Sequence, residues 1–336
     1  MRLTIVTDAW GPSQINGVVR TLETTVDLLR RRGEIVTVIH PGLFHTFALP
    51  RYPEIRVARN AWKVGRLIRD SAPDYLHIAV EGSLGFTAKL WADRRGYKYT
   101  TAFHTRFPEY LLEHYRVRLK TGYGLLRWFH SRSAAVMVNT PSMRRQLTEE
   151  NFDNLVAWGR GVDTDLFRPD GLFNSQMFAL PRPLLLNVGR VSIEKNLPAF
   201  YEVDVVGTKV QVGAGPMLAN YRERYPDVVF LGTKVGSELA ACYRTADVFV
   251  FPSLTDTYGL VMLEAIASGV PVAAYPVPGP NDVVFGMDGV LNDDLGQAIR
   301  AALAACDTAA LRASALRRGW DACTDQFAAN LVSIVT

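Results

Sequence analysis

One segment of the sequence combines two carboxylates with a glycine at the start of an apolar helix. Residues 251–264 read FPSLTDTYGLVMLE, in which a buried strand leads into a loop with Asp256, and Gly259 opens the helix that carries Glu264. The amides of residues 258–260 then lie at the positive end of that helix, where phosphate oxygens bind. Because carboxylates accept hydrogen bonds from vicinal hydroxyls, the segment predicts a ligand with sugar on both sides of a diphosphate.

A purely structural interpretation of this segment is the alternative. Asp256 would then cap the helix, and Glu264 would be solvated. Glu264 lies in an apolar run over residues 260–267, where a carboxylate without a partner is costly, and this favours the functional interpretation.

Two cations follow a second strand end. Residues 189–196 read GRVSIEKN, so Arg190 and Lys195 come five residues apart directly after the run 184–188. Two fixed cations hold a diphosphate and stabilise the charge that grows on it as a bond to it breaks. A solvated basic loop is the alternative.

Four other strand ends carry candidate residues. Asn16-Gly17 stands at a helix start, where bare amides and a glycine suit a phosphate, although Asn16 as an ordinary cap explains the same pattern. His104 follows the run 97–102 and is expected to point into a cleft, with a structural histidine as the alternative. Glu81 has weaker support. The turn at residues 213–216 predicts close backbone packing or a nucleotide border.

The elements that position these residues alternate along the chain. The predicted strands are residues 3–7, 35–39, 75–78, 97–102, 135–138, 184–188, 210–212, 228–231, 248–251 and 270–274. The predicted helices between them include residues 18–32, 83–95, 216–224, 238–245 and 260–268, and a helical tail covers 311–331. This alternation predicts two doubly wound parallel α/β domains joined near residues 159–183, with strand ends lining a cleft.

Composition narrows the class of protein. The chain has 336 residues, 48% of them hydrophobic and 21% charged, which is typical of a soluble globular protein and excludes disordered, collagen-like and coiled-coil chains. Three cysteines without C-x-x-C spacing argue against a disulfide framework or a zinc site and favour a reducing compartment. The first residues predict a strand rather than a signal peptide, and no apolar run approaches the roughly 18 residues of a membrane span.

The net charge of +4 is unevenly distributed. Residues 1–168 contain 25 Lys and Arg against 16 Asp and Glu, whereas residues 169–336 contain 12 against 17. The basic character therefore belongs to a function of the first half.

Taken together, these motifs resemble the retaining GT-B glycosyltransferases of family 4 over nearly the whole chain. The resemblance rests on TDAW at 7–10, NGVVRT at 16–21, FHTRFP at 103–108, GRGVD at 159–163, GRVSIEKN at 189–196 and SLTDTYG at 253–259. It is closest to the branch of sulfoquinovosyl- and glucuronosyl-diacylglycerol synthases and GDP-mannose-dependent α-mannosyltransferases.

The resemblance implies two Rossmann-like domains that face each other across a deep cleft. Residues 1–165 would form the acceptor domain, residues 166–310 the donor domain, and residues 311–336 a helix that packs back towards the first domain. It also implies transfer with retention and without a metal, in which the leaving diphosphate takes the proton of the acceptor hydroxyl.

The resemblance also assigns the site residues. Arg190 and Lys195 would bind the diphosphate, Asp256 the transferred sugar and Glu264 the ribose, and His104 would contact the sugar near the reacting centre. The other donor-binding residues would be Asn16, Gly17, Gly189, Thr257, Tyr258, Gly259 and Leu260.

The sequence departs from the family pattern in two places. The usual Glu-x7-Glu is here Asp256-x7-Glu264, one methylene shorter, which leaves the identity of the sugar open. The span from Asn196 to Gly207 is short for a crossover helix, so the second domain is expected to lack a full helix there.

The favoured function is transfer of a hexose-type sugar from a UDP-sugar to a lipid such as diacylglycerol, by a cytoplasmic protein bound peripherally to the inner face of the plasma membrane. Basic and aromatic residues that follow His104 predict contact with an acceptor and an anionic membrane, and no nucleic acid is expected. They are Arg106, Arg116, Arg118, Lys120, Arg127 and Trp128. A solvated basic face is the structural alternative.

Four other functions are considered. A GDP-mannose-dependent mannosyltransferase with a soluble or polysaccharide acceptor is the first alternative. An epimerase or a phosphorylase shares a two-domain fold, but a phosphorylase needs a pyridoxal phosphate lysine in a much longer chain. A sugar-nucleotide binding module without activity has no use for cations and carboxylates on both sides of a cleft.

Overall fold

The computed structural model describes residues 1–11, 17–49, 52–104, 119–256 and 258–334. The chain divides into two compact units. Unit 1 contains residues 1–160 and 320–336, and unit 2 contains residues 161–319. The chain therefore passes between the units twice, at Arg160/Gly161 and at Gly319/Trp320.

Unit 1 is built on a parallel six-stranded sheet in the order β2-β1-β5-β6-β7-β8. Its strands are β1 (Arg2–Val6), β2 (Ile35–Ile39), β5 (Tyr75–Ile78), β6 (Thr100–Phe103), β7 (Ala135–Val138) and β8 (Leu155–Ala157). An antiparallel pair, β3 (Thr46–Leu49) and β4 (Tyr52–Ala58), lies outside this sheet. The strand order reverses at β1, and ligands of open α/β sheets bind at such a reversal.

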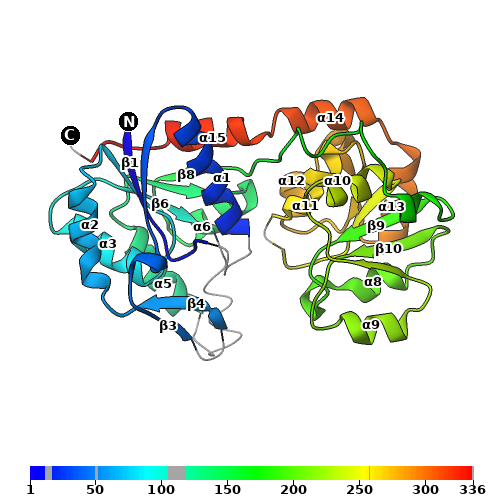
Figure 1. Ribbon diagram of the computed structural model, residues 1–336, viewed down its shortest axis with the longest axis horizontal. Helices are drawn as coiled ribbons and strands as arrows, with labels where there is room; N and C mark the ends of the chain where they lie inside the picture. Colours follow the sequence, from blue (N-terminus) through cyan, green and yellow to red (C-terminus); the bar gives the residue numbers. More distant parts are fainter. Residues whose placement is uncertain (12–16, 50–51, 105–118, 257, 335–336) are drawn as a thin grey trace. The chain divides into compact units, whose positions relative to one another are not determined.

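Helices cover both faces of the sheet of unit 1 (Figure 1). They are α1 (Gly17–Arg31), α2 (Val64–Asp70), α3 (Ser83–Asp93), α5 (Leu119–His130), α6 (Pro141–Glu149) and α15 (Trp320–Ala329). Leu3 and Ile5 of β1 pack against α1 and α15, whereas the next side chain, Val6, packs with α2 and α3. Both faces of β1 are thus buried, which explains its continuous apolar run.

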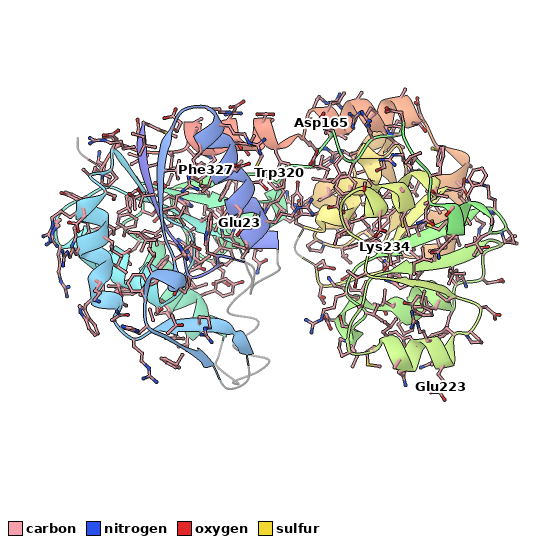
Figure 2. The ribbon with its side chains drawn as sticks, in the orientation of Figure 1. Glu23, Asp165, Glu223, Lys234, Trp320 and Phe327 are labelled. Atoms are coloured by element: carbon pink, nitrogen blue, oxygen red, sulfur yellow. The ribbon has the colours of Figure 1, made fainter. Side chains whose placement is uncertain are left out.

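Helix α15 completes the core of unit 1 although it follows unit 2 in the sequence. Its aromatic residues Trp320 and Phe327, labelled in Figure 2, belong to the same buried cluster as Trp158 and Leu22. Phe327 is fully buried, and its ring lies 4.8 Å from that of Trp158. The core of unit 1 is therefore discontinuous in the sequence.

Unit 2 repeats the architecture, with a parallel sheet in the order β11-β10-β9-β12-β13-β14. Its strands are β9 (Leu184–Val188), β10 (Thr208–Val212), β11 (Val229–Gly232), β12 (Val248–Phe251), β13 (Val272–Ala274) and β14 (Gly289–Leu291). The order reverses at β9, which pairs with β10 and β12. The loops after β9 and β12 therefore leave the sheet side by side.

Two layers of helices enclose the sheet of unit 2. The helices are α7 (Ser175–Phe178), α8 (Leu197–Tyr201), α9 (Leu218–Arg224), α10 (Gly236–Thr245), α11 (Leu260–Ala267), α12 (Pro280–Val283), α13 (Leu295–Ala304) and α14 (Thr308–Leu316). Leu184 and Leu186 pack with α10, α11 and α14, whereas Leu185 packs with α8, α9 and α13.

Every strand predicted from the sequence is present, with ends that differ by at most three residues. The crossover after Asn196 contains only α8, five residues long, which confirms the expectation of a shortened helix. The sequence predicted a domain boundary at residue 165/166 and a closing helix over 311–336. Contacts divide the chain at 160/161 and 319/320 instead.

The structure corrects two expectations about secondary structure. The prediction of one helix over residues 311–331 is wrong, because α14 ends at Leu316 and α15 begins at Trp320, on either side of Gly319. The strands β3 and β4 were missed, and Pro53 stands within β4, where a proline argues against a strand because it cannot donate to a strand ladder.

Candidate active site

Two loops of unit 2 bring predicted site residues into direct contact. They are residues 189–196, after β9, and residues 252–256, after β12. Lys195 Nζ donates to both carboxylate oxygens of Asp256, at 2.7 and 2.8 Å, and Asn196 Nδ2 donates to the Pro252 carbonyl at 3.0 Å. The adjacency of β9 and β12 therefore produces a joined pair of loops at the carboxyl edge of the sheet.

The contact between Lys195 and Asp256 bears on whether Asp256 caps α11. The residue that caps α11 is Gly259, and the Asp256 carboxylate is engaged by the Lys195 ammonium. The alternative that Asp256 caps the helix is therefore wrong. Both side chains are about one-quarter exposed, at 27% and 25%, so the ion pair is open to an incoming ligand.

Gly259 is required by its backbone conformation. Its φ of +78° lies in the left-handed region, which favours glycine, and a Cβ at this position would lie 3.0 Å from the Phe251 ring. Because glycine has no side chain, Gly259 itself does not cover the backbone amides in the first turn of α11. Tyr258 and Leu260 flank it and are partly buried, whereas Thr257 lies outside the described residues.

Glu264 is buried in α11 and has a specific partner. Its side chain is 3% exposed, and the Tyr243 hydroxyl of α10 donates to Oε2 at 2.9 Å. Tyr243 is itself buried between Phe167 and Phe249. The alternative of a solvated Glu264 is therefore wrong. No pattern in the sequence indicated Tyr243, because a buried tyrosine on an apolar helix face is ordinary core.

The loop that carries Arg190 is held by close backbone packing. A Cβ on Gly213 would lie 2.0 Å from the Gly189 carbonyl oxygen, and one on Gly215 would lie 2.3 Å from that of Val191. The prediction of close packing at residues 213–216 is confirmed. Arg190 is exposed, and no ion pair joins it to another residue in the described part of the chain.

In unit 1, His104 is buried directly after β6. It is 4% exposed, and its Nδ1 lies 2.8 Å from Nη2 of Arg160, the last residue before the chain enters unit 2. Burial, with the positive charge of Arg160, holds the pKa of His104 well below its usual value. Arg160 was missed by sequence reasoning.

Gly17 begins α1 and is exposed, whereas Asn16 lies outside the described residues.

Two carboxylates near these strand ends have structural partners. Glu81 Oε1 lies 3.1 Å from His130 Nε2, and both side chains are buried. The Asp8 carboxylate accepts hydrogen bonds from the Ser83 hydroxyl at 2.8 Å and from the Leu84 amide at 3.0 Å. Burial raises the pKa of Asp8, although these donors oppose the shift. Asp8 thus joins the end of β1 to the start of α3.

The predicted acceptor and membrane residues fall partly within α5. Lys120 is exposed, and Trp128 is 46% exposed while it covers Lys89, whose Nζ lies 4.7 Å from the ring centroid. Arg127 is half-buried and donates to the Glu150 carbonyl. The remaining three, Arg106, Arg116 and Arg118, lie outside the described residues.

A cavity of about 520 Å³ in unit 2 lies away from these loops. Residues at the starts of strands line it, among them Pro183 before β9 and Asp247 before β12, at the amino edge of the sheet.

Within the described residues no three His, Cys, Asp or Glu side chains are grouped as metal ligands. None of the described helices is both long and apolar enough to span a bilayer.

Both units of the chain are similar to known proteins. Residues 15–166 match the family model described as Glycosyltransferase Family 4, and residues 182–307 match Glycosyl transferases group 1. A GDP-mannose-dependent alpha-mannosyltransferase of Mycolicibacterium smegmatis is 30% identical over 312 residues, which cover 84% of this chain and 82% of that protein. Sulfoquinovosyl transferase SQD2 of Arabidopsis thaliana is 26% identical over 80% of this chain, which spans only 58% of SQD2.

Solved structures show the same fold at low sequence identity. Anabaena HepE, solved with UDP and glucose, superposes with a TM-score of 0.70 at 14% identity and covers 98% of both chains. The sucrose-phosphate synthase of Thermosynechococcus elongatus gives a TM-score of 0.73 at 19% identity over 97% of both chains. The two parallel α/β units are those of the GT-B fold, and the chain belongs to glycosyltransferase family 4.

Proposed function

We propose that the protein transfers a hexose-type sugar, with retention and without a metal, from a UDP-sugar to a hydroxyl of a lipid at a membrane surface. The observation that carries the proposal is the joined pair of loops, which places Lys195, Asp256 and the start of α11 at the carboxyl ends of β9 and β12. One relative supports a lipid acceptor by name, an alpha-monoglucosyldiacylglycerol synthase of Streptococcus pneumoniae that is 26% identical over 91% of this chain.

In the proposed mechanism the protein acts through position and charge. Lys195 and Arg190 hold the diphosphate and stabilise the charge that grows as its bond to the anomeric carbon breaks. The leaving diphosphate takes the proton from the acceptor hydroxyl, whose oxygen bonds to the anomeric carbon on the same face. Asp256 and the start of α11 hold the sugar, and Glu264, oriented by Tyr243, accepts from the ribose hydroxyls.

A second candidate is transfer of mannose from GDP-mannose to a soluble or polysaccharide acceptor. The relative from Mycolicibacterium smegmatis, at 30% identity over most of both chains, favours it. The two candidates share the assigned residues and differ in the nucleotide base and the acceptor, so one binding experiment separates their donors.

The proposal predicts that a nucleoside diphosphate stabilises the protein in the presence of EDTA, because the cations assigned to the diphosphate are side chains of the chain itself. A ligand at 100 times its dissociation constant adds about 2.7 kcal/mol to the free energy of unfolding. The measurement is thermal unfolding with UDP, GDP and their sugars. A larger shift with GDP than with UDP would favour the second candidate, and a strict need for a divalent ion would refute the metal-free proposal.

Membrane binding is the second prediction. The protein is expected to sediment with liposomes that contain anionic lipid and not with neutral ones, since each cation near the surface contributes about 1 kcal/mol. Binding should fall as salt rises. It should fall again in the triple variant Arg116→Ser, Arg118→Ser and Lys120→Ser.

A triple variant with the same loss of charge elsewhere in unit 1 serves as the matched control. Lys63, Arg94 and Arg144 are exposed and lie on other elements, and their replacement by serine should weaken liposome binding much less. Equal effects of the two triple variants would mean that net charge, rather than the segment after His104, drives binding. A protein that ignores anionic liposomes at low salt would refute the membrane proposal.

A further inference from the structure

The buried Arg160 forms a hydrogen bond with one ring nitrogen of His104, the histidine assigned to the site. Arg160 Nη2 lies 2.8 Å from His104 Nδ1, and its guanidinium carbon lies 5.4 Å from the centroid of Trp158. Arg160 is 6% exposed and His104 is 4% exposed. The contact is therefore shielded from water, which strengthens a hydrogen bond to a charged donor.

The direction of this hydrogen bond fixes the protons of the ring. A guanidinium has five N–H donors and no acceptor, so His104 Nδ1 accepts and carries no hydrogen. If the ring were doubly protonated, the N–H at Nδ1 would point at an N–H of Arg160, and two donors in contact repel each other. The charged groups and histidines that act on His104 are Arg160, His77 and His130, and burial alone lowers the pKa of His77 to about 3. His104 is consequently neutral, with its one hydrogen on Nε2.

The Nε2 atom of His104 is a buried hydrogen-bond donor for which the described residues provide no acceptor. It has no hydrogen-bond partner among the described residues, and its own exposed area is below 1 Å². A buried polar atom without a partner is costly and rare in folded proteins. His104 comes directly after β6, at the edge of the sheet where ligands of such folds bind.

We propose that Arg160 is a positioning residue that fixes His104 as the neutral Nε2-protonated tautomer, whose N–H donates to an oxygen of the bound sugar. The second part rests on the proposed function. The same geometry excludes His104 as the base for the acceptor hydroxyl, because the ring nitrogen that Arg160 leaves free already carries a proton. Oxygen-rich ligands suit this donor, whereas a ligand that presents an N–H there does not.

The tautomer is tested without substrate by 15N NMR of the full chain labelled at its six histidines, with His104 assigned by the loss of its signals in His104→Gln. The expected result is an unprotonated Nδ1 and a protonated Nε2 in the native protein. In Arg160→Met this preference should be lost, and Arg160→Gln, whose amide still donates, should restore it. A protonated Nδ1 or a charged ring in the native protein would overturn the proposal.

Kinetics test the consequence for the sugar. Arg160→Met should lower kcat about tenfold, the effect of one hydrogen bond, with less change in the donor KM, and Arg160→Gln should recover part of the loss. His104→Gln, which keeps an N–H donor, should be more active than His104→Met even where the Arg160 variants fold poorly. Equal activity of these two His104 variants would overturn donation to the sugar. The fixed tautomer in a protein that transfers no sugar would support the role of Arg160 and refute the proposed function.

Discussion

Replacing Lys195 by alanine is expected to lower turnover by at least about a hundredfold while the donor KM changes far less. The reason is that the charge on the diphosphate grows towards the transition state, so a cation held at that point acts mainly there. Loss of one such contact costs on the order of 3 kcal/mol of barrier. Arg190→Ala should act in the same direction, and steady-state kinetics with the donor varied gives both parameters.

The ion pair of Lys195 with Asp256 makes this prediction sharper. Lys195→Ala removes the proposed phosphate contact and also leaves Asp256 without the ammonium group that lies 2.7 Å from its carboxylate. A double-mutant cycle with Asp256→Asn separates the two effects, and we expect the combined loss to be smaller than the sum of the single losses.

The matched control is Arg222→Ala. Arg222 is an exposed cation of α9 in the same unit and lies outside the two loops, so turnover should be unchanged. Near-normal turnover in both Lys195→Ala and Arg190→Ala, with a loss of donor affinity alone, would show that these cations anchor the donor and do not stabilise the transition state.

The largest effect on stability is expected for Gly213→Ala. Gly213 has a φ of +130°, which alanine adopts only with strain of about 1–3 kcal/mol. The new methyl group would also lie 2.0 Å from the Gly189 carbonyl oxygen, and such overpacking costs roughly another 1–3 kcal/mol. Calorimetry should show the unfolding transition of unit 2 lowered by about 10 °C, given shifts of about 2–4 °C per kcal/mol at this size.

Gly189→Ala tests whether this loss comes from the clash. A Cβ on Gly189 would have no atom within 4 Å, and its φ is not positive, so the transition of unit 2 should move little. Donor binding in Gly189→Ala then reports separately whether a ligand approaches this backbone. A Gly213→Ala protein as stable as the Gly189→Ala protein would mean that the loop adjusts, and that Arg190 is held less firmly than the packing indicates.

The sequence was enough to predict which residues stand at strand ends, because buried parallel strands leave runs such as residues 184–188 and 248–251 that periodicity reveals. It did not predict that Lys195 and Asp256 touch. That contact depends on β9 and β12 being neighbours, and strand order is a property of the whole sheet rather than of any local run.

Partners that come from other elements were missed for the same reason. Tyr243 on α10 and Arg160 after β8 each contact a candidate residue far away in the sequence, Glu264 and His104 respectively. Tyrosine is common in protein cores and arginine is mostly exposed, so neither residue type indicates by itself that it contacts a site residue. The Gly319 break between α14 and α15 was hidden because the apolar spacing continues across it.

The placement of α15 in unit 1 has a consequence for biosynthesis. Residues 161–319 form a continuous unit that acquires all of its core before α15 has been made, whereas unit 1 needs Trp320 and Phe327 to cover Trp158. At translation rates of about 5–20 residues per second, the first 160 residues wait on the order of ten to thirty seconds for these side chains. The half of the protein that leaves the ribosome first is therefore expected to be the half that completes its core last.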